Sequence, residues 1–385
     1  MRNKILKNFC QYRSARINIK EVTLDNFVTT DNLLQNKAGI EKAINLPPQE
    51  GNIPKYYKHD ILVANIRPYL KKIWFADREG GCSADVLVFE VHSDNDPKFI
   101  YYALFRDDFF NHMMKGSKGT KMPRGDKLQI LDFTIPQFSK PTQQKIAAVL
   151  SALDAKIELN NRINAELEAM AKTLYDCWFV QFDFPDQNGN PYKSSGGKMT
   201  YNPTLKRQIP YGWAVKTLGN VFKLYQPKTI SEKEFDEFGD YFVYGANGIV
   251  GKYNKYNHES QQVALTCRGS TCGNLTKTLP FSWITGNAMV MAPINHTWDI
   301  EFTYNLAKNS NIHAIITGSG QPQITRANLE GLKCIIAKDN IIENYCKVTS
   351  PISSKRVTIQ KQNQELTQVR DWLLPMLMNG QVIIK

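Results

Sequence analysis

An internal repeat constrains the fold of this 385-residue chain more than any other feature. The loop GSKGTKMPRGDK at 116–127 returns as GSGQPQITRAN at 318–328, and each copy leads into an apolar run. Further pairs of segments recur in the same order at a nearly constant offset: 60–72 with 263–274, 84–91 with 286–293, and 164–167 with 363–366. Ordered self-similarity of this kind indicates duplication, so we expect two copies of one structural unit of roughly 200 residues.

Aligning the two halves assigns equivalent residues to the duplicated loops. The alignment pairs Arg67 with Arg268, Asp85 with Asn287, Gly116 with Gly318, and Arg124 with Arg326. Glycine in such loops permits tight turns and close backbone approach. The duplicated loops are therefore the first candidates for a function that each half performs once.

Both halves have the same internal order. Short apolar segments rich in Val, Ile, Tyr and Phe, broken by Gly, Pro and Asn, predict strands with a few helices. In the first half a long helix is predicted next, which begins near Pro141 and Thr142 and continues without Gly or Pro over 143–179. In the second half we expect the helix after Pro351, interrupted by Pro375 and stopped by Gly380. The predicted fold class is mixed α/β (α+β), with two similar globular domains separated by two long helices.

The apolar positions of both helices alternate between spacings of three and four residues, which is the heptad pattern of a coiled coil. Polar residues on such a seam lower its stability but fix its register. We expect an antiparallel pair, because the globular unit between the helices lets the chain return; the alternative is that each helix packs on its own domain. The predicted seam residues are Leu150, Leu153, Ile157, Asn160, Asn164, Leu167, Ala171, Leu174 and Trp178 in the first helix, and Ile352, Lys355, Ile359, Gln362, Leu366, Val369, Leu373 and Met376 in the second.

Glycine and proline mark the boundary between the halves. The segment DQNGNPYKSSGGKMTYNP at 186–203 is poor in apolar residues and predicts an exposed linker. The predicted divisions of the chain are a first domain at 1–140, a central helix at 141–182, a linker at 183–204, a second domain at 205–348 and a C-terminal helix at 349–385.

Composition narrows the class of partner. Lys and Arg outnumber Asp and Glu by 48 to 36, a formal net charge of +12, which favours a polyanion, nucleic acid before an anionic membrane surface. No apolar run approaches the roughly 18 residues of a membrane span, and the N-terminal residues lack the core of a signal peptide. The seven cysteines show no zinc-ligand spacing. We expect a cytoplasmic protein with reduced, mostly buried thiols, no metal site and no membrane contact.

Signatures of catalysis are missing from the sequence. There is no GxxxxGK[ST] loop for nucleotide phosphates, no GxGxxG after a strand and no HExxH. The Asn/Asp-Pro-Pro-aromatic motif of enzymes that methylate a flipped adenine is also absent. We therefore expect a chain that has no catalytic residues.

Both halves carry side chains that suit nucleic acid. Arg and Lys neutralise phosphates, and Arg, Gln, Ser and Thr also bond to base edges in the major groove. The first set is rich in Lys and the second in Gln, as expected of two modules of one design that read different sequences. The candidate DNA-binding residues are Arg67, Tyr69, Lys71, Lys72, Lys118, Lys121 and Arg124 in the first half, and Arg268, Ser270, Thr271, Ser319, Gln321, Gln323 and Arg326 in the second.

Long segments of the chain resemble the specificity (S) subunits of type I restriction-modification systems. Residues 143–185 are similar to the central conserved region of that family, YKSSGGKMTYNPTLKRQIPYGW to the segment after that region, and 366–385 to the C-terminal conserved region. NIRPYLKKIWFADREGGCSADVLVF and GSKGTKMPRGDK resemble one type of first target-recognition domain. The second helix departs from the pattern, since it has no counterpart of QQKIAAVL at its start.

The resemblance implies two target-recognition domains held apart by two antiparallel helices, each domain reading half of a split, asymmetric site on double-stranded DNA. It implies that the helices dock two modification (methyltransferase) subunits and that two restriction (translocase and endonuclease) subunits complete the complex. S-adenosylmethionine, ATP and Mg would belong to those partners, and this chain would bind no cofactor. A helix of about 35 residues is roughly 50 Å long, enough to set the roughly 34–36 Å between successive major-groove faces.

Two other functions stay open on the sequence alone. The chain could be a self-contained DNA methyltransferase or nuclease, although the missing cofactor motifs argue against an enzyme. It could also be a coiled-coil scaffold whose globular ends bind proteins. A scaffold predicts no steep dependence of DNA affinity on salt, whereas several Lys and Arg contacts to phosphates predict one.

Overall fold

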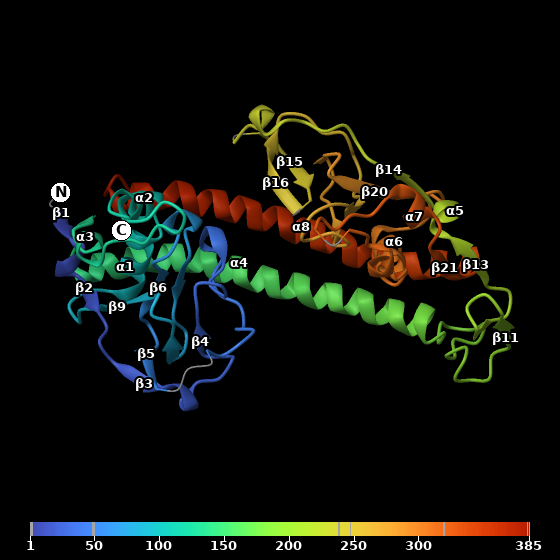
Figure 1. Ribbon diagram of the computed structural model, residues 1–385, viewed down its shortest axis with the longest axis horizontal. Helices are drawn as coiled ribbons and strands as arrows, with labels where there is room; N and C mark the ends of the chain where they lie inside the picture. Colours follow the sequence, from blue (N-terminus) through green and yellow to red (C-terminus); the bar gives the residue numbers. More distant parts are fainter. Residues whose placement is uncertain are drawn as a thin grey trace. The chain divides into compact units, whose positions relative to one another are not determined.

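A computed structural model describes residues 3–47, 51–237, 239–246, 248–318, 320–382 and 384. The chain forms two compact units. Unit 1 consists of Met1–Leu159 and Asn363–Lys385, and unit 2 of Asn160–Gln362. The two longest helices, α4 (Lys140–Tyr175) and α8 (Asp339–Met378), are each divided between the units, so every unit contains a part of both (Figure 1).

Unit 1 is built around a four-stranded antiparallel sheet in the order β2-β9-β6-β7. Its strands are rich in branched and aromatic residues, which pack well on a pleated surface. They are β2 (Cys10–Tyr12), β6 (Ile61–Ala64), β7 (Ile73–Phe75) and β9 (Val86–Val91). A second sheet has the order β3-β5-β8-β4, with β3 (Arg16–Asn18), β4 (Phe27–Val28), β5 (Asn52–Tyr56) and β8 (Gly80–Cys82).

Helices cover the first sheet and complete the core of unit 1. One buried cluster contains Phe89 of the sheet, Phe99 and Phe109 of the short helices, Leu150 of α4 and Leu377 of α8. The remaining elements are β1 (Asn3–Ile5), η1 (Leu6–Asn8), η2 (Ile19–Glu21), η3 (Gln35–Lys37), η4 (Pro68–Leu70), α1 (Pro97–Leu104), α2 (Asp107–Lys115), α3 (Lys127–Ile130) and β10 (Thr134–Pro136), which pairs with β1.

Unit 2 repeats this architecture with a sheet in the order β14-β20-β17-β18. Its strands are β14 (Phe222–Tyr225), β17 (Val263–Thr266), β18 (Leu275–Lys277) and β20 (Ala288–Pro293). Leu62 faces Val88 across the central strand pair of unit 1, and Ala264 faces Val290 in unit 2, so the register is the same as well as the order. The predicted duplication is confirmed at the level of strand pairing.

The rest of unit 2 surrounds this sheet. A three-stranded sheet has the order β16-β15-β19. The elements are η5 (Asp176–Val180), β11 (Met199–Asn202), β12 (Arg207–Pro210), β13 (Ala214–Thr217), α5 (Leu218–Val221), η6 (Glu232–Glu234), β15 (Tyr241–Gly245), β16 (Gly248–Tyr253), β19 (Trp283–Ile284), α6 (Ile300–Lys308), η7 (Ile312–Ile315), α7 (Arg326–Glu330) and β21 (Lys333–Ile336). None of the helices among the described residues is long and apolar enough to cross a membrane.

The two long helices are antiparallel within each unit. In unit 1 the Arg370 guanidinium donates to Asp154 at 2.9 Å, and the Asn363 amide donates to the carbonyl of Ile157 at 3.5 Å. In unit 2, Arg356 donates to Glu168 at 3.0 Å. Residues later in α4 thus meet residues earlier in α8, as predicted from the heptad pattern together with the globular unit that lets the chain return. Their ends also lie in the domain cores, so packing on the globular units accompanies the pairing and does not replace it.

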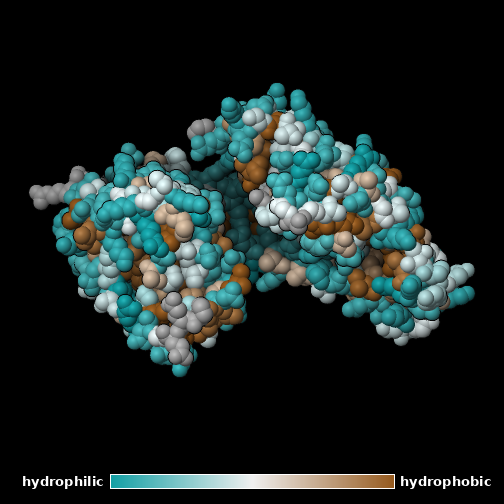
Figure 2. All heavy atoms as spheres, in the orientation of Figure 1, coloured by the Kyte–Doolittle hydropathy of each residue, from teal (hydrophilic) through white to brown (hydrophobic). Residues whose placement is uncertain are grey.

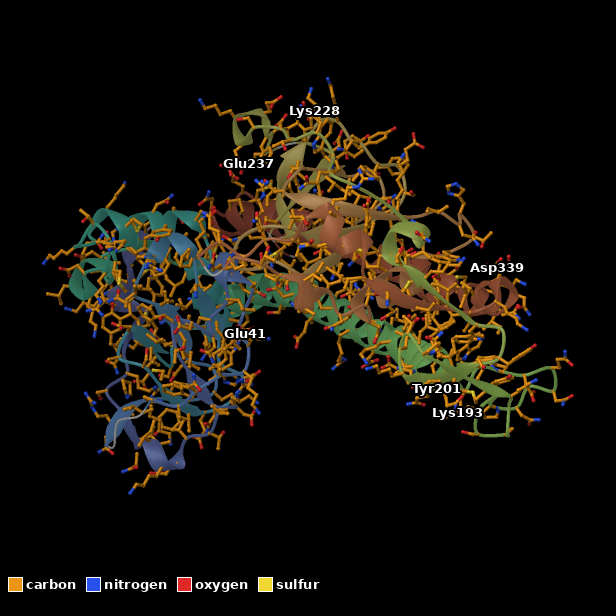
Figure 3. The ribbon with its side chains drawn as sticks, turned by 45° about the vertical axis from the view of Figure 1, so that its right-hand side comes forward. Glu41, Lys193, Tyr201, Lys228, Glu237 and Asp339 are labelled. Atoms are coloured by element: carbon orange, nitrogen blue, oxygen red, sulfur yellow. The ribbon has the colours of Figure 1, made fainter. Side chains whose placement is uncertain are left out.

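The start of α8 differs from the prediction. The helix begins at Asp339, labelled in Figure 3, and not after Pro351. Proline within a helix removes one backbone donor, but Pro351 is exposed, and the turns before it are held by Ile342 and Tyr345 in the core of unit 2. The prediction began the helix at Pro351. In the structure the turns before this proline are helical because they are buried in the core of unit 2. Gly380, with a φ of 65°, follows the end of the helix as expected.

The seam of α8 lies one residue later than predicted at three positions. Lys355, Gln362 and Val369 are exposed or lie beside the seam, and the side chains that face α4 are Arg356, Asn363 and Arg370. The prediction favoured Val369 because it is apolar, but an inward arginine is satisfied by an acid on α4. The other predicted seam residues are buried or half-buried: Leu150, Leu153, Ile157, Asn160, Asn164, Leu167, Ala171, Leu174, Trp178, Ile352, Ile359, Leu366, Leu373 and Met376.

The segment at 183–204 is mostly exposed, as predicted, but it is folded and not an extended linker. The ring of Phe184 stacks on Tyr192, with centroids 4.6 Å apart, and on Trp213 at 5.2 Å. β11 and β12 pair as a hairpin, and Tyr201 of β11 is labelled near Lys193 in Figure 3. Scattered aromatic residues among turn formers gave no local periodicity, so their packing was invisible in the sequence.

A cluster of four charges joins the elements of unit 2. Glu301 of α6 is 1% exposed and accepts from Lys277 of β18 at 2.9 Å and from Arg356 at 2.8 Å. Glu168 of α4 lies 3.2 Å from Lys277 and 3.0 Å from Arg356. Burial alone would raise the pKa of Glu168, but the two cations outweigh it and lower that pKa below its ordinary value. The balanced cluster therefore fixes α4 and α8 on the sheet of unit 2.

We expect Glu301→Ala to destabilise unit 2 strongly. The change leaves two buried cations facing each other beside Glu168, and breaking a buried pair typically costs about 3–5 kcal/mol. Glu330→Ala is the matched control, because Glu330 pairs with Arg326 on an exposed helical turn, where such a pair is worth roughly 0.5 kcal/mol or less. Urea unfolding measures both variants. Equal losses in the free energy of unfolding would contradict the structural role of the cluster.

Candidate nucleic-acid interface

In unit 1 the candidate residues gather where β6 ends. The backbone N–H of Arg67 donates to the carbonyl of Pro123 at 2.8 Å, and that of Gly125 donates to Asn65 at 3.2 Å. Lys118 and Arg124 exchange two backbone hydrogen bonds, of 2.9 and 3.0 Å. These bonds hold the loop at 116–127 against the residues that follow β6. Two segments that the sequence presented separately therefore form one surface, which we call the unit 1 loop site (residues 65–72 and 116–127).

Unit 2 builds the same scaffold. The N–H of Gly269 donates to Pro322 at 3.0 Å, and that of Ile324 donates to Cys267 at 3.0 Å. Thr317 and Gln323 exchange two backbone bonds of 3.0 and 2.8 Å. We call this surface the unit 2 loop site (residues 267–274 and 317–326).

The backbone corrects the equivalence of Arg124 and Arg326. Isolated bridges join Arg124 to Ile66 and to Lys118, and they join Gln323 to Arg268 and to Thr317, so the residue equivalent to Arg124 is Gln323. The helices that follow agree, since Asp126 caps α3 and Thr325 caps α7. Arg326 is the first residue of α7 and corresponds to Lys127.

The glycines explain why the sequence alignment slipped. Gly119 and Gly318 have φ angles of 92° and 89°, a left-handed conformation that favours glycine, so they are the equivalent pair. Gly116, which the alignment paired with Gly318, instead follows the end of α2. The shared Gly-Ser dipeptide was a coincidence of sequence, whereas the turn geometry decides the register. The backbone also corrects the partner of Arg67. Its equivalent in unit 2 is Gly269 and not Arg268, with which the alignment had paired it.

The unit 1 loop site exposes several of the predicted side chains. Lys118 is 86% exposed, and Arg67, Tyr69 and Lys121 are also exposed. Arg124 is 58% exposed, and its Nη2 lies 2.9 Å from an oxygen of Asp85. The site therefore combines exposed cationic side chains that suit phosphates with one arginine whose direction is set by a carboxylate.

Lys72 does not belong to this surface, and Lys71 is held by an ion pair. Lys72 is buried, its ammonium donates to the carbonyl of Thr30, and desolvation lowers its pKa. Lys71 is half-buried and pairs with Asp107 at 2.9 Å. The sequence shows a lysine pair but cannot show which member points inward.

The unit 2 loop site is less basic. Arg268, Ser270, Gln321 and Arg326 are exposed, and Gln323 is at the bridge that holds the loop. Thr271 is half-buried and donates to the carbonyl of Ala246 at 3.2 Å, so it anchors the loop. Arg326 pairs with Glu330 at 2.7 Å. Ser319 lies outside the described residues.

A cleft of about 500 Å³ adjoins the unit 2 loop site. Its lining includes Thr271 and Asn274 of the loop and Lys308 and His313 from the helices beyond it. Sequence reasoning missed the last two, because they are isolated in the sequence and no local pattern marks them. Among the described residues, no group of three or more His, Cys, Asp and Glu side chains could hold a metal ion.

Salt dependence should separate the exposed lysines from the buried one. We expect Lys118→Ala and Lys121→Ala each to weaken DNA binding and to lower the slope of log affinity against log salt by about 0.9 for each lost phosphate contact. Lys72→Met should leave the slope unchanged, because the ammonium is buried. Fluorescence anisotropy with duplex DNA at several salt concentrations measures all three. An unchanged slope in both alanine variants would show that these lysines do not contact phosphates.

Comparisons with known proteins agree with this geometry. Residues 4–169 and 210–368 match the family model described as type I restriction modification DNA specificity domain. The chain is 24% identical over 92% of its length to the type I restriction enzyme HindI specificity subunit of Haemophilus influenzae, of which the alignment covers 94%. It is 26% identical over 75% of its length to the MjaIX specificity subunit of Methanocaldococcus jannaschii, of which it covers 69%.

A solved structure shares the fold. The crystal structure of the type I restriction-modification system S subunit from M. genitalium matches 98% of this chain and 96% of its own, with a TM-score of 0.55 and 18% identity. The family model covers both halves of the chain, each of which holds one loop site. The chain belongs to the family of type I restriction-modification DNA specificity subunits.

Proposed function

We propose that this chain binds a bipartite, asymmetric site on double-stranded DNA, that each unit reads one half, and that the long helices dock methyltransferase subunits. One observation carries the proposal: the same loop scaffold is built twice, at 65–67 with 118–125 and at 267–269 with 317–324, and bears different side chains. Equivalent backbone bonds that carry different polar side chains suit two readers of unlike sequences.

Charge and helix length support the proposal. The formal net charge of +12 favours a polyanion. α4 has 36 residues, which corresponds to roughly 54 Å at the rise of an α-helix. Recognition elements on one face of a duplex lie roughly 34–36 Å apart, so a helix of this length can act as the spacer between half-sites.

Two exposed apolar side chains support the docking of two partner copies. Met170 of α4 is 54% exposed in unit 2, and Val369 of α8 is 43% exposed in unit 1. They are 199 residues apart in the sequence, the same offset as the first residues of α4 and α8. Most of the visible surface of each unit is hydrophilic (Figure 2). Matched apolar anchors on helices therefore suit two copies of one methyltransferase subunit.

In this proposal the chemistry belongs to the partners. The methyltransferase subunits would bind S-adenosylmethionine, and two restriction subunits would use ATP and Mg. The chain itself would select the DNA sequence. Incubation of the purified chain with a labelled methyl donor and DNA tests the division of labour: incorporation of label without a partner would identify a self-contained methyltransferase.

Exchange of one recognition domain should change one half-site. We expect replacement of residues 214–336, from β13 to β21, by the corresponding segment of another family member to alter one half of the methylated motif and preserve the other. The exchange leaves unit 1 and the long helices unchanged. Methylome sequencing of strains with the original and the exchanged gene measures the motif. A change in both halves would refute independent reading.

Loss of the apolar anchors should remove partner subunits one at a time. We expect Val369→Asp and Met170→Asp each to reduce the bound methyltransferase subunits from two to one, and the double variant to bind none, because each anchor serves one copy and a charge there would oppose apolar contact. Val348→Asp is the control, since Val348 is 47% exposed on α8 but its equivalent in α4, Val149, is half-buried. Native mass spectrometry counts the subunits. Two bound subunits in the double variant would contradict the assignment of the anchors.

A further inference from the structure

One pair of equivalent positions differs between the loop sites in a coordinated way. Unit 1 holds Asp85 and Arg124, and unit 2 holds Asn287 and Gln323 at the same places in the scaffold. We propose that Arg124 reads a guanine in the half-site bound by unit 1 and that Gln323 reads an adenine in the half-site bound by unit 2. The inference rests on the proposed function and assigns the bases that its two readers select.

The backbone at both positions is fixed from two sides. Arg124 is bridged to Ile66 on one side and to Lys118 on the other. Gln323 is bridged to Arg268 and to Thr317 in the same way. Reading a base edge requires a side chain whose origin does not move, because a displacement of about 1 Å breaks a pair of hydrogen bonds. These residues meet that requirement, whereas Lys121 lies in the turn beyond the bridges.

In unit 1 a carboxylate orients the arginine. Nη2 of Arg124 lies 2.9 Å from Oδ1 of Asp85, and both side chains are partly exposed, at 58% and 37%. A guanidinium carries five N–H donors in a planar fork, so one contact sets its plane while other donors face outward. Two such donors match O6 and N7 of guanine, which is the commonest specific contact in the major groove.

In unit 2 both members of the pair are amides. The side-chain amide of Gln323 offers one donor and one acceptor, which match N7 and N6 of adenine. Asn287, exposed just before β20, replaces the aspartate where no arginine is present to neutralise it. An unpaired carboxylate beside DNA would be repelled by phosphates. The acid and the arginine of unit 1 are thus replaced together by two amides in unit 2, as expected if the two sites select different bases.

Two other cations of the loop sites are placed differently. Lys118 is 86% exposed, and its ammonium is 3.6 Å from Asp126. Arg326 pairs with Glu330 along the first turn of α7. Highly exposed cations, and cations paired along their own helix, suit phosphates, which carry no sequence information. Specificity at this point of each scaffold is thus assigned to one residue.

The test transfers the unit 2 pair into unit 1. The chain, in complex with its methyltransferase subunits, selects duplexes from a randomised pool, and the bound DNA is sequenced. The wild-type complex should select an invariant guanine in one half-site and an invariant adenine in the other. Asp85→Asn with Arg124→Gln should change that guanine to adenine and leave the second half-site as it was.

Two further variants make the test specific. Arg124→Lys keeps the charge but loses the planar fork, and it should lower the preference for guanine by roughly 5- to 150-fold while non-specific binding persists. The matched control is Asp77→Asn with Arg78→Gln. These residues form an exposed ion pair at 2.9 Å just after the end of β7, whereas the loop site lies before its start. The control should select the wild-type site.

Each remaining outcome overturns the inference. An unchanged site in the Asp85→Asn, Arg124→Gln variant would assign Arg124 to a phosphate. A change in both half-sites, or loss of all sequence selection by a variant that circular dichroism shows to be folded, would refute the transfer of adenine reading. If the wild-type complex selects a bipartite site that lacks the guanine or the adenine, the base assignment fails and the proposed function stands. If it selects no bipartite site, the proposed function fails.

Discussion

The burial of helix ends in the globular cores is the constraint on which the rest of this structure depends. Leu150 of α4 and Leu377 of α8 belong to the core of unit 1, and Tyr175 and Tyr345, near the other ends of the same helices, belong to the core of unit 2. Neither helix can therefore leave its neighbour without opening a core. The charged cluster around Glu301 also orients α8 on unit 2, because Lys277 and Arg356 both pair with Glu301 in this arrangement.

Function depends on the features that the duplication kept and on those that it changed. Both units keep the strand order, the register and the bridges that hold the loop against the end of a strand. The side chains at the tips differ, as in Arg124 and Gln323. A shared backbone with variable tips lets one chain present two different recognition surfaces, and that property suits a member of a family that supplies DNA specificity.

Much of the architecture could be predicted because it follows from repeats and periodic spacing in the sequence. The constant offset revealed the duplication, and alternate spacings of three and four residues revealed the helix pair. The loop sites were predicted in part: Lys118, Lys121 and Arg124 are exposed as expected, whereas Lys72 is buried. Burial of a lysine depends on a carbonyl forty-two residues away in the sequence, that of Thr30, which no local pattern contains.

The sequence by itself determined the two-unit plan, the long helices and the basic character of the duplicated loops, since these depend on composition and spacing. The tertiary structure alone decided the start of α8, the inward turn of Arg356 and Arg370, and the match of Arg124 with Gln323. Each of those depends on partners that are distant in the sequence: a core that holds the first turns, an acid on the opposite helix, a strand end that bridges to a loop. Long-range packing and pairing select among local options that the sequence leaves nearly equal.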